Sequence, residues 1–250
     1  MTLEETVADY DVRSPASRTL LTVVGTVLIV GVIVGLVLGA SLLKRDTRVS
    51  TSVVELDGSA QVVIDGGSAD VTLVEGVDDV VSISARITSG LRETQFALGR
   101  RGDEIKIASA CQSWLSPGCG VAVTLEIPKG LPVVVRTTSG NVVTDALTEG
   151  VLTVTSGSGD IAATRLEVDE FSAETGSGEI RASFAKQPFG FKAFTGAGDI
   201  HATVPTGKRG YVVSAKSRSG AVANTLESNA EGAGFVRVRS DSGDIQLGSR

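Results

Sequence analysis

The stretch that decides the fold is LTVTSGSGDI at residues 152–161, because FSAETGSGEI at 171–180 and FKAFTGAGDI at 191–200 repeat its pattern. Each copy has apolar residues at its first and third places, a hydroxyl at the fifth, glycine at the eighth and isoleucine at the tenth. Looser copies flank these three, and the six repeat glycines are Gly140, Gly159, Gly178, Gly198, Gly220 and Gly243. They lie 19 to 23 residues apart, a period typical of arrays whose stacked units bury one shared core.

The positions within one unit predict a strand, a corner and a second strand. The first and third residues point to one face of a strand, while the polar second and fourth residues point away from it. The glycine permits the positive φ that a tight corner needs, and a Val or Ile two places later turns inward again. Because the columns are chemically uniform, we predict an all-β solenoid with like strands stacked in parallel, and an antiparallel β-meander is the alternative.

The region before the clear repeats shows strand-like alternation with a looser period. Ser68-Ala69-Asp70-Val71 is a degenerate copy of the repeat corner in which alanine replaces glycine, so it indicates an early or capping coil. No helical pattern appears after Leu43.

Residues 19–43 form an uncharged, mainly apolar run, which as a helix exceeds the roughly 30 Å of a bilayer's hydrocarbon core. A cleaved signal peptide is the competing interpretation, but its apolar segment would be shorter and its start basic. We therefore predict a cytoplasmic tail at 1–18, a transmembrane helix contacting the lipid bilayer at 19–43, a linker at 44–49 and an extracytoplasmic β-repeat domain at 50–250.

The two cysteines, Cys111 and Cys119, bracket a short loop that bends at Pro117 and Gly118. This spacing suits a local disulfide, which persists outside the cytosol, and two buried free thiols are the alternative. The basic residues flanking the apolar run weakly favour the opposite arrangement, with the C-terminal domain in the cytoplasm. We give the cysteines more weight and place the C-terminal domain outside the membrane.

The charge distribution argues against nucleic acid as a partner. Residues after Arg48 carry 24 acidic and 18 basic side chains without a basic block, whereas binding nucleic acid requires clustered Lys and Arg. The acidic residues that follow the repeat glycines would stack on one another and are weak calcium candidates, although solvated turn chemistry explains them as well: Asp160, Glu179, Asp199 and Asp244.

Catalysis finds little support in the sequence. His201 is the only histidine, a G-x-S-x-G motif is absent, and a pair of glycosidase-type carboxylates is the one catalytic arrangement that remains open, with Asp160, Asp199 and Asp244 as its candidates. We expect no catalytic residue, no metal and no cofactor.

The order CQSWLSPGCGVAVTLEIPKG (111–130) followed by serial SGD[VI]-type corners resembles the bacterial membrane-anchored putative adhesins, a β-strand-repeat family of unknown function. The resemblance covers roughly 50–250 and implies a right-handed β-helix or similar solenoid with no assigned catalytic or binding residue. Ala221, in place of the usual acidic residue, and the longer units before Gly220 and Gly243 depart from the pattern.

These observations together predict a non-enzymatic, adhesin-like binding or scaffold module with an extracytoplasmic protein or glycan as its partner. The alternative is an envelope sensor whose N-terminal tail contacts a cytoplasmic partner. A polysaccharide-active enzyme is the third possibility.

Overall fold

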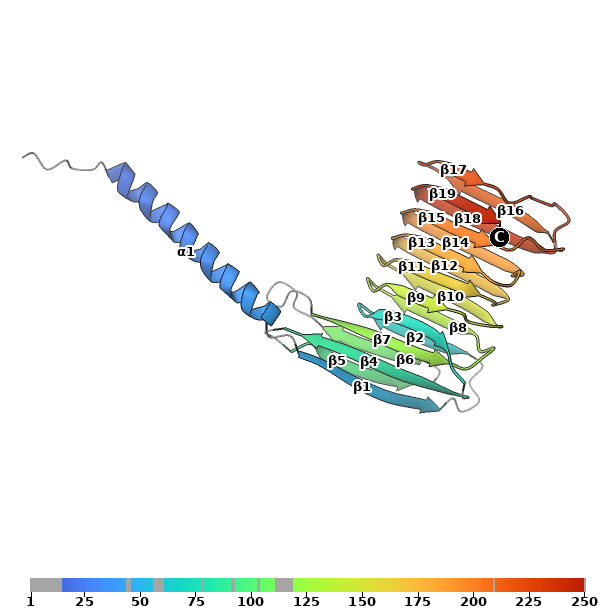
Figure 1. The fold of residues 1–250 in the computed structure, drawn as a ribbon, viewed down its shortest axis with the longest axis horizontal. Coiled ribbons are helices and arrows are strands. Elements are labelled where there is room, and N and C mark those ends of the chain that lie inside the picture. Colours follow the sequence, from blue (N-terminus) through green and yellow to red (C-terminus); the bar gives the residue numbers. More distant parts are fainter. Residues whose placement is uncertain are drawn as a thin grey trace, which may run out of the picture.

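The computed structural model of the chain describes residues 15–43, 46–55, 61–77, 79–90, 93–102, 104–110, 119–208 and 210–249. Within them, helix α1 (Pro15–Leu43) is followed by strands that form a ten-stranded and a nine-stranded sheet. Figure 1 shows the helix leading into one end of a long stack of strands, and the C-terminal strands lie at the other end.

The ten-stranded sheet has the spatial order β1 (Asp46–Glu55), β4 (Val80–Ser89), β7 (Gly120–Ile127), β3 (Asp70–Glu75), β9 (Val142–Asp145), β11 (Ile161–Leu166), β13 (Ile180–Phe184), β15 (Ile200–Val204), β19 (Ile245–Ser249) and β17 (Val222–Asn224). The nine-stranded sheet has the order β16 (Tyr211–Ser217), β18 (Gly234–Ser242), β14 (Gly190–Ala197), β12 (Glu170–Ser177), β10 (Val151–Ser156), β8 (Val133–Thr137), β2 (Val62–Gly67), β6 (Glu104–Ala110) and β5 (Gln95–Arg101).

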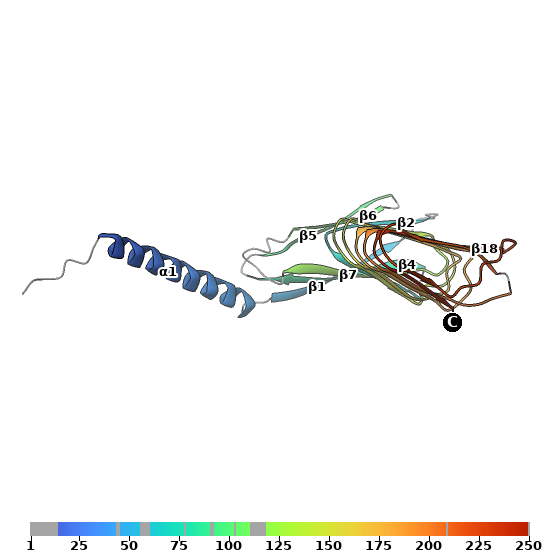
Figure 2. The ribbon, with the colours of Figure 1, turned by 90° about the horizontal axis from the view of Figure 1, so that it is seen from above.

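The repeat units stack in parallel and in register, as their uniform columns predict. Leu152 pairs with Val133 on one side and with Phe171 on the other, and Phe171 pairs in turn with Phe191. Each unit places its first strand in the nine-stranded sheet and its second in the ten-stranded sheet, and the corner joins the two. Figure 2 looks nearly along the stack, where the units overlap as flattened loops. The repeats therefore adopt the solenoid arrangement and not the antiparallel meander.

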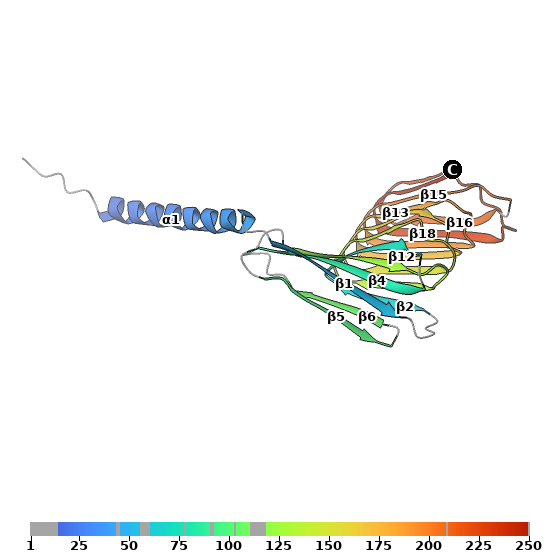
Figure 3. The same ribbon diagram turned by 60° about the horizontal axis from the view of Figure 1, so that its bottom comes forward.

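Antiparallel pairing occurs at the N-terminal end of the stack. There β1 pairs with β4, β4 with β7, and β5 with β6. Figure 3 shows these longer strands extending at the end nearest the helix. The fold is therefore a mainly parallel two-sheet stack with an antiparallel end, rather than a uniform solenoid throughout.

The order of units in space differs from the order in sequence at both ends. The unit formed by β6 and β7 lies outside the earlier unit formed by β2 and β3. At the other end, the last unit, β18 and β19, is inserted between β14/β15 and β16/β17. The longer spacings before Gly220 and Gly243 supply the chain that the exchange at the C-terminal end needs.

The core lies between the two sheets and is built from the inward positions of every unit. Its largest fully buried side chains are Phe171, Phe184 and Phe191, each at most 1% exposed. The rings of Phe171 and Phe191 are stacked with centroids 5.8 Å apart, and Phe184 meets Phe191 edge-on at 5.2 Å. Such aromatic pairs contribute beyond the area they bury, so these three rings tie adjacent units together.

Helix α1 includes the whole apolar run at 19–43, which the sequence predicts to be helical. The described helices include none that is both long and apolar enough to cross a membrane. Strand β1 begins at Asp46, so most of the predicted linker at 44–49 is the first part of a strand paired with β4.

Two predictions fall wholly or partly outside the described residues. Most of the N-terminal tail at 1–18 does so, and so does Cys111. Cys119 is described and is not a free thiol, and its predicted pairing with Cys111 stays a prediction.

Candidate functional site

The corner glycines form a column in which the backbones of successive units touch. A Cβ placed on Gly159 would lie 2.1 Å from the carbonyl oxygen of Gly140, and one on Gly178 would lie 2.4 Å from that of Gly159. Of the six repeat glycines, Gly198 and Gly243 have positive φ. At the other four positions, the predicted positive φ is wrong as the reason for glycine. There the close approach between units excludes a side chain.

The hydroxyl column of the repeats is buried and bonds one unit to the next. Thr175 Oγ1 donates to the carbonyl oxygen of Gly159 at 3.0 Å, and Thr195 Oγ1 donates to that of Gly178 at the same distance. Both threonine residues are fully buried. A buried hydroxyl without a partner would cost free energy, so this column specifies the stacking register as well as stabilising it.

The acidic and amide residues after the glycines form a second ladder of hydrogen bonds between units. Asp160 Oδ1 accepts the backbone N–H of Glu179 at 2.8 Å, and Asn141 Oδ1 accepts that of Asp160 at 2.9 Å. The same bond, from a side-chain oxygen to the N–H of the equivalent residue in the next unit, joins Asp70 to Asn141, Asp199 to Asp244 and Asp244 to Ala221.

The position of Ala221 in the stack explains its departure from the pattern. Because β17 is the outermost strand of the ten-stranded sheet, no further unit presents an N–H for a side chain at this position to accept. Ala221 therefore closes the ladder by donating its own N–H to Asp244 and needs no acceptor of its own.

Glu179 is the exception within the ladder. Its longer side chain forms an ion pair with Arg181 and places Oε1 3.4 Å from Nε2 of His201. His201, the only histidine of the sequence, is about one-third exposed on β15 and lies beside this carboxylate. The pair sits on the surface of the ten-stranded sheet rather than in an enclosed pocket.

The ladder accounts for three of the four calcium candidates without a cation, because Asp160, Asp199 and Asp244 each accept a backbone N–H. The fourth, Glu179, forms its ion pair with Arg181 instead. Among the described residues, no group of three or more His, Cys, Asp or Glu side chains is arranged to hold a metal ion. The three carboxylates considered for glycan cleavage, Asp160, Asp199 and Asp244, lie in one stacked column as hydrogen-bond acceptors.

One exposed carboxylate on β9 has a shifted acidity. The hydrogen bond from the Arg165 guanidinium, followed by that from the Thr164 hydroxyl, lowers the pKa of Asp145 below its ordinary value of 3.8. These hydrogen bonds also join neighbouring units, since Asp145 lies on β9 and pairs in register with Thr164 of β11.

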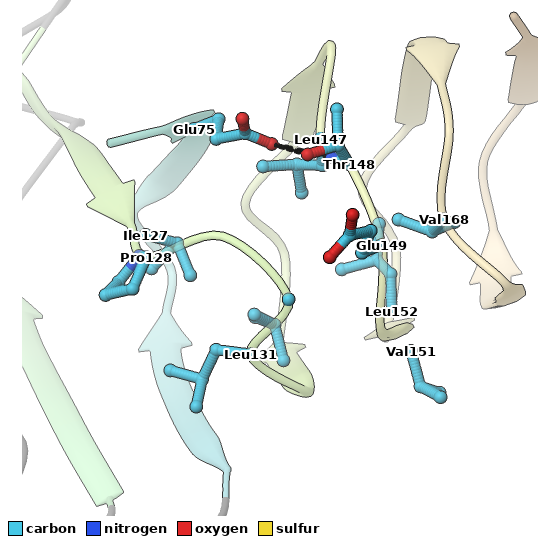
Figure 4. Close-up of a pocket in the computed structure, with 12 residues that line it drawn as sticks. Glu75, Ile127, Pro128, Leu131, Leu147, Thr148, Glu149, Val151, Leu152 and Val168 are labelled. Carbon is cyan, nitrogen blue, oxygen red and sulfur yellow. Dashed lines mark hydrogen bonds between the residues drawn. The ribbon is translucent and has the colours of Figure 1, made fainter. Parts of the chain in front are cut away.

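A small cavity lies between the corner after β7 and the segment that joins β9 to β10. Figure 4 shows Glu75 directed at Thr148, while Leu131, Leu147 and Leu152 line the apolar side. Glu75 Oε2 accepts the backbone N–H of Thr148 at 2.8 Å and also its hydroxyl proton. The cavity holds about 10 Å³, room for about one water molecule, so it is a packing feature rather than a ligand site.

The outer face of the nine-stranded sheet carries a different cluster at the C-terminal end of the stack. We call it the distal basic face: Lys192 and Phe194 of β14, Phe235, Arg237 and Arg239 of β18, and Lys216 of β16. These residues occupy outward positions, so the four cations are exposed and the two rings are half-buried.

The rings of this face contact three of its four cations. Lys192 Nζ lies 5.2 Å and the Arg237 guanidinium 5.8 Å from the centre of the Phe235 ring. The Arg239 guanidinium lies 5.8 Å from the centre of the Phe194 ring. These distances are within the range of cation–π attraction.

Sequence reasoning missed the distal basic face because the cations are separated in the chain by whole units. The signal was present in the second and fourth places of the repeat. In β10 these places hold Thr153 and Thr155, whereas in β18 they hold Arg237 and Arg239. The exchanged order of the last units sets β18 beside β14 and so makes Arg237 a direct neighbour of Lys192.

Two facing, mainly parallel sheets built from a repeated strand, corner and strand define an all-β repeat domain. Residues 126–248 match the family model described as Toastrack DUF4097. The match covers just under half of the chain, and it agrees with the expected resemblance to a β-strand-repeat domain of unknown function.

The chain is also similar to several solved structures. It shares 11% identity and a TM-score of 0.49 with a putative cell adhesion protein from Clostridium sporogenes, covering 82% of this chain and 100% of that one. It shares 12% identity and a TM-score of 0.43 with a putative adhesin from Bacteroides fragilis, covering 81% of this chain and 97% of that one. With a putative adhesin from Parabacteroides distasonis it shares 11% identity and a TM-score of 0.38, covering 82% of this chain and 95% of that one. No curated protein matches the chain.

Proposed function

We propose that the chain is a single-pass membrane protein that holds a non-enzymatic, adhesin-like binding module outside the cytoplasm. The anchor would be the apolar run at 19–43, in which most of the described side chains are exposed; Val27, Leu28 and Leu36 are each 64% to 68% exposed. Exposing so many large apolar side chains to water is unfavourable, and lipid removes that cost. A Cys111–Cys119 disulfide would support the extracytoplasmic side.

The observation that carries the binding role is the position of the distal basic face. Strand β1, which follows the helix, lies at one edge of the ten-stranded sheet, and β19 and β17 lie at the other. Eight strand spacings separate β1 from β19, or about 40 Å at about 4.8 Å each. A rigid stack of this length would present its far end to a partner away from the anchor.

Location is tested with a C-terminal epitope after Arg250 on the full-length chain. We expect antibody to label intact cells and external protease to remove the epitope. Labelling that appears only after permeabilisation contradicts the proposed orientation. An N-terminal epitope should behave in the opposite way, which controls for leakage.

Binding is tested by the retention of cells expressing the full-length chain on a layer of isolated cell-envelope material. The double variant Phe194→Ser/Phe235→Ser changes the distal face without changing net charge, and we expect it to lower retention at equal surface expression. The matched control Thr153→Ser/Thr155→Ser alters the same sheet face on β10. Equal retention by all three chains argues against a binding role for the distal face.

A further inference from the structure

We propose that the distal basic face binds an acidic polysaccharide whose sugar rings carry carboxylates. This inference rests on the proposed binding function and names the class of its ligand. Cations are not a general feature of these places, because the units of β10 and β12 hold threonine, serine and glutamate there, and Arg136 of β8 lies beside Asp65.

The first argument is the placement of like charges as direct neighbours. Lys192 pairs in register with Arg237, and Arg239 pairs in register with Lys216. Neighbouring strands lie about 4.8 Å apart, and like charges opposed across strands are destabilising. The cluster occurs in a chain with a net charge of −6. An anion that binds between these cations relieves their repulsion and so stabilises the fold.

The second argument is that little on the protein neutralises this cluster. Asp241 lies 2.9 Å from the Arg239 guanidinium and 3.8 Å from that of Arg218. Among the described contacts, Lys192 and Arg237 share only the ring of Phe235, and no carboxylate pairs with either. These two cations are therefore held in position and available for an external carboxylate, with which a guanidinium can form two parallel hydrogen bonds.

The shape of the face favours an extended polymer over a small anion. The cations form two rows across β14, β18 and β16, separated by about 6.6 Å along the strands. They lie on an open sheet surface rather than in a cavity. A flexible chain of acidic sugars can contact both rows at once, whereas a single carboxylate reaches only one.

Charge density and position separate this ligand from two other polyanions. Duplex DNA carries about one charge per 1.7 Å, far denser than four cations spread over three strands, and the faces of both rings are occupied by cations rather than open for base stacking. The anchoring membrane is disfavoured because the face lies at the opposite end of the stack from β1.

The test measures binding of polygalacturonate to the full-length chain, immobilised in a nonionic detergent, at 50 mM and 500 mM NaCl. Neutral dextran, a single-stranded oligothymidylate and anionic lipid vesicles serve as comparison probes. The variant is Lys192→Gln/Arg237→Gln. Its matched control, Arg86→Gln/Arg136→Gln, removes two exposed cations elsewhere on the two sheets.

We expect the wild-type chain to bind polygalacturonate but not dextran, with affinity falling at least tenfold at the higher salt. The Lys192→Gln/Arg237→Gln variant should bind at least tenfold more weakly, with an unchanged or higher melting temperature, and the control should change less than twofold. Equal weakening of both variants overturns the proposal, as does tighter binding of oligothymidylate or vesicles.

The proposed ligand class and the proposed binding function can be refuted separately. If polygalacturonate does not bind but cell retention still depends on Phe194 and Phe235, the ligand class is wrong and the binding module stands. If retention is also independent of both rings, the proposed function fails with it.

Discussion

Adding one methyl group at Gly159 should damage the fold more than its size suggests. The new Cβ of Gly159→Ala would lie 2.1 Å from the carbonyl oxygen and 2.6 Å from the carbonyl carbon of Gly140. Both are backbone atoms of a neighbouring unit, so the contact cannot be relieved by turning a side chain. The two units must separate at this corner.

The cost follows from the hydrogen bonds that meet at this corner. Gly159 donates its N–H to Ser156 Oγ at 2.8 Å and accepts from Thr175 Oγ1 at 3.0 Å, and Asp160 donates its N–H to Asn141 Oδ1 at 2.9 Å. Each contributes about 1 kcal/mol net, and a buried hydroxyl left without a partner costs about 1–3 kcal/mol more. We expect the free energy of unfolding to fall by about 3–5 kcal/mol.

The assay is urea unfolding of the full-length chain followed by its β-sheet circular dichroism. The matched control is Gly248→Ala on β19, where the nearest atoms to a new Cβ lie 4.0 Å away. Replacing glycine by alanine at a compatible site stabilises a protein by about 0.4–1 kcal/mol through the unfolded state, so the control should be neutral or slightly stabilised. Equal midpoints for the two variants would refute the argument from close approach.

Three further predictions concern the ladder, an ion pair and the core. Asp160→Leu should destabilise by about 1–2 kcal/mol, because the N–H of Glu179 loses its acceptor, whereas Asp160→Asn should stay within about 0.5 kcal/mol; chemical denaturation distinguishes them, and equal losses contradict the ladder. Arg165→Gln should raise the pKa of Asp145, measured by NMR titration. Since the folded pKa is lowered, the stability from this pair is present above pH 3.8 and is lost as the pH falls through the folded value. Phe191→Ala should cost about 3–5 kcal/mol in urea unfolding, and a loss below 1 kcal/mol would show that the stacked rings contribute little.

The sequence predicted the repeat architecture because its cause is local and periodic. Alternating apolar places such as Phe171 and Ala173 define one face of a strand, and the recurrence of that face predicts stacking. The reason for the glycines was only half predicted, since a positive φ is a property of one residue, whereas the contact between Gly159 and Gly140 exists only once two units are stacked.

The candidate site was less predictable, since it depends on which units become neighbours. The acidic column was noticed as a possible cation site, yet its role as an acceptor ladder required the spatial order of Asp160 and Glu179. The distal basic face required more, because Lys192 and Arg237 are 45 residues apart in the chain and adjacent in the sheet. A periodic pattern identifies which positions share a column, but it does not fix the order of the units.

The exchanged order of the last two units has a physical reason that connects fold and function. The inward places of the last unit hold Val236, Val238, Ile245 and Leu247, whereas the paired places of the preceding unit hold Val213, Ala215, Val222 and Asn224. Burying the more apolar unit inside the stack places the weaker one at the end, where Ala221 needs no acceptor role. The same exchange sets β18 between β14 and β16, so that Arg237 pairs with Lys192 on one side and Arg239 pairs with Lys216 on the other. The interruption of the repeat therefore places the strand with two arginines, β18, at the centre of the distal basic face.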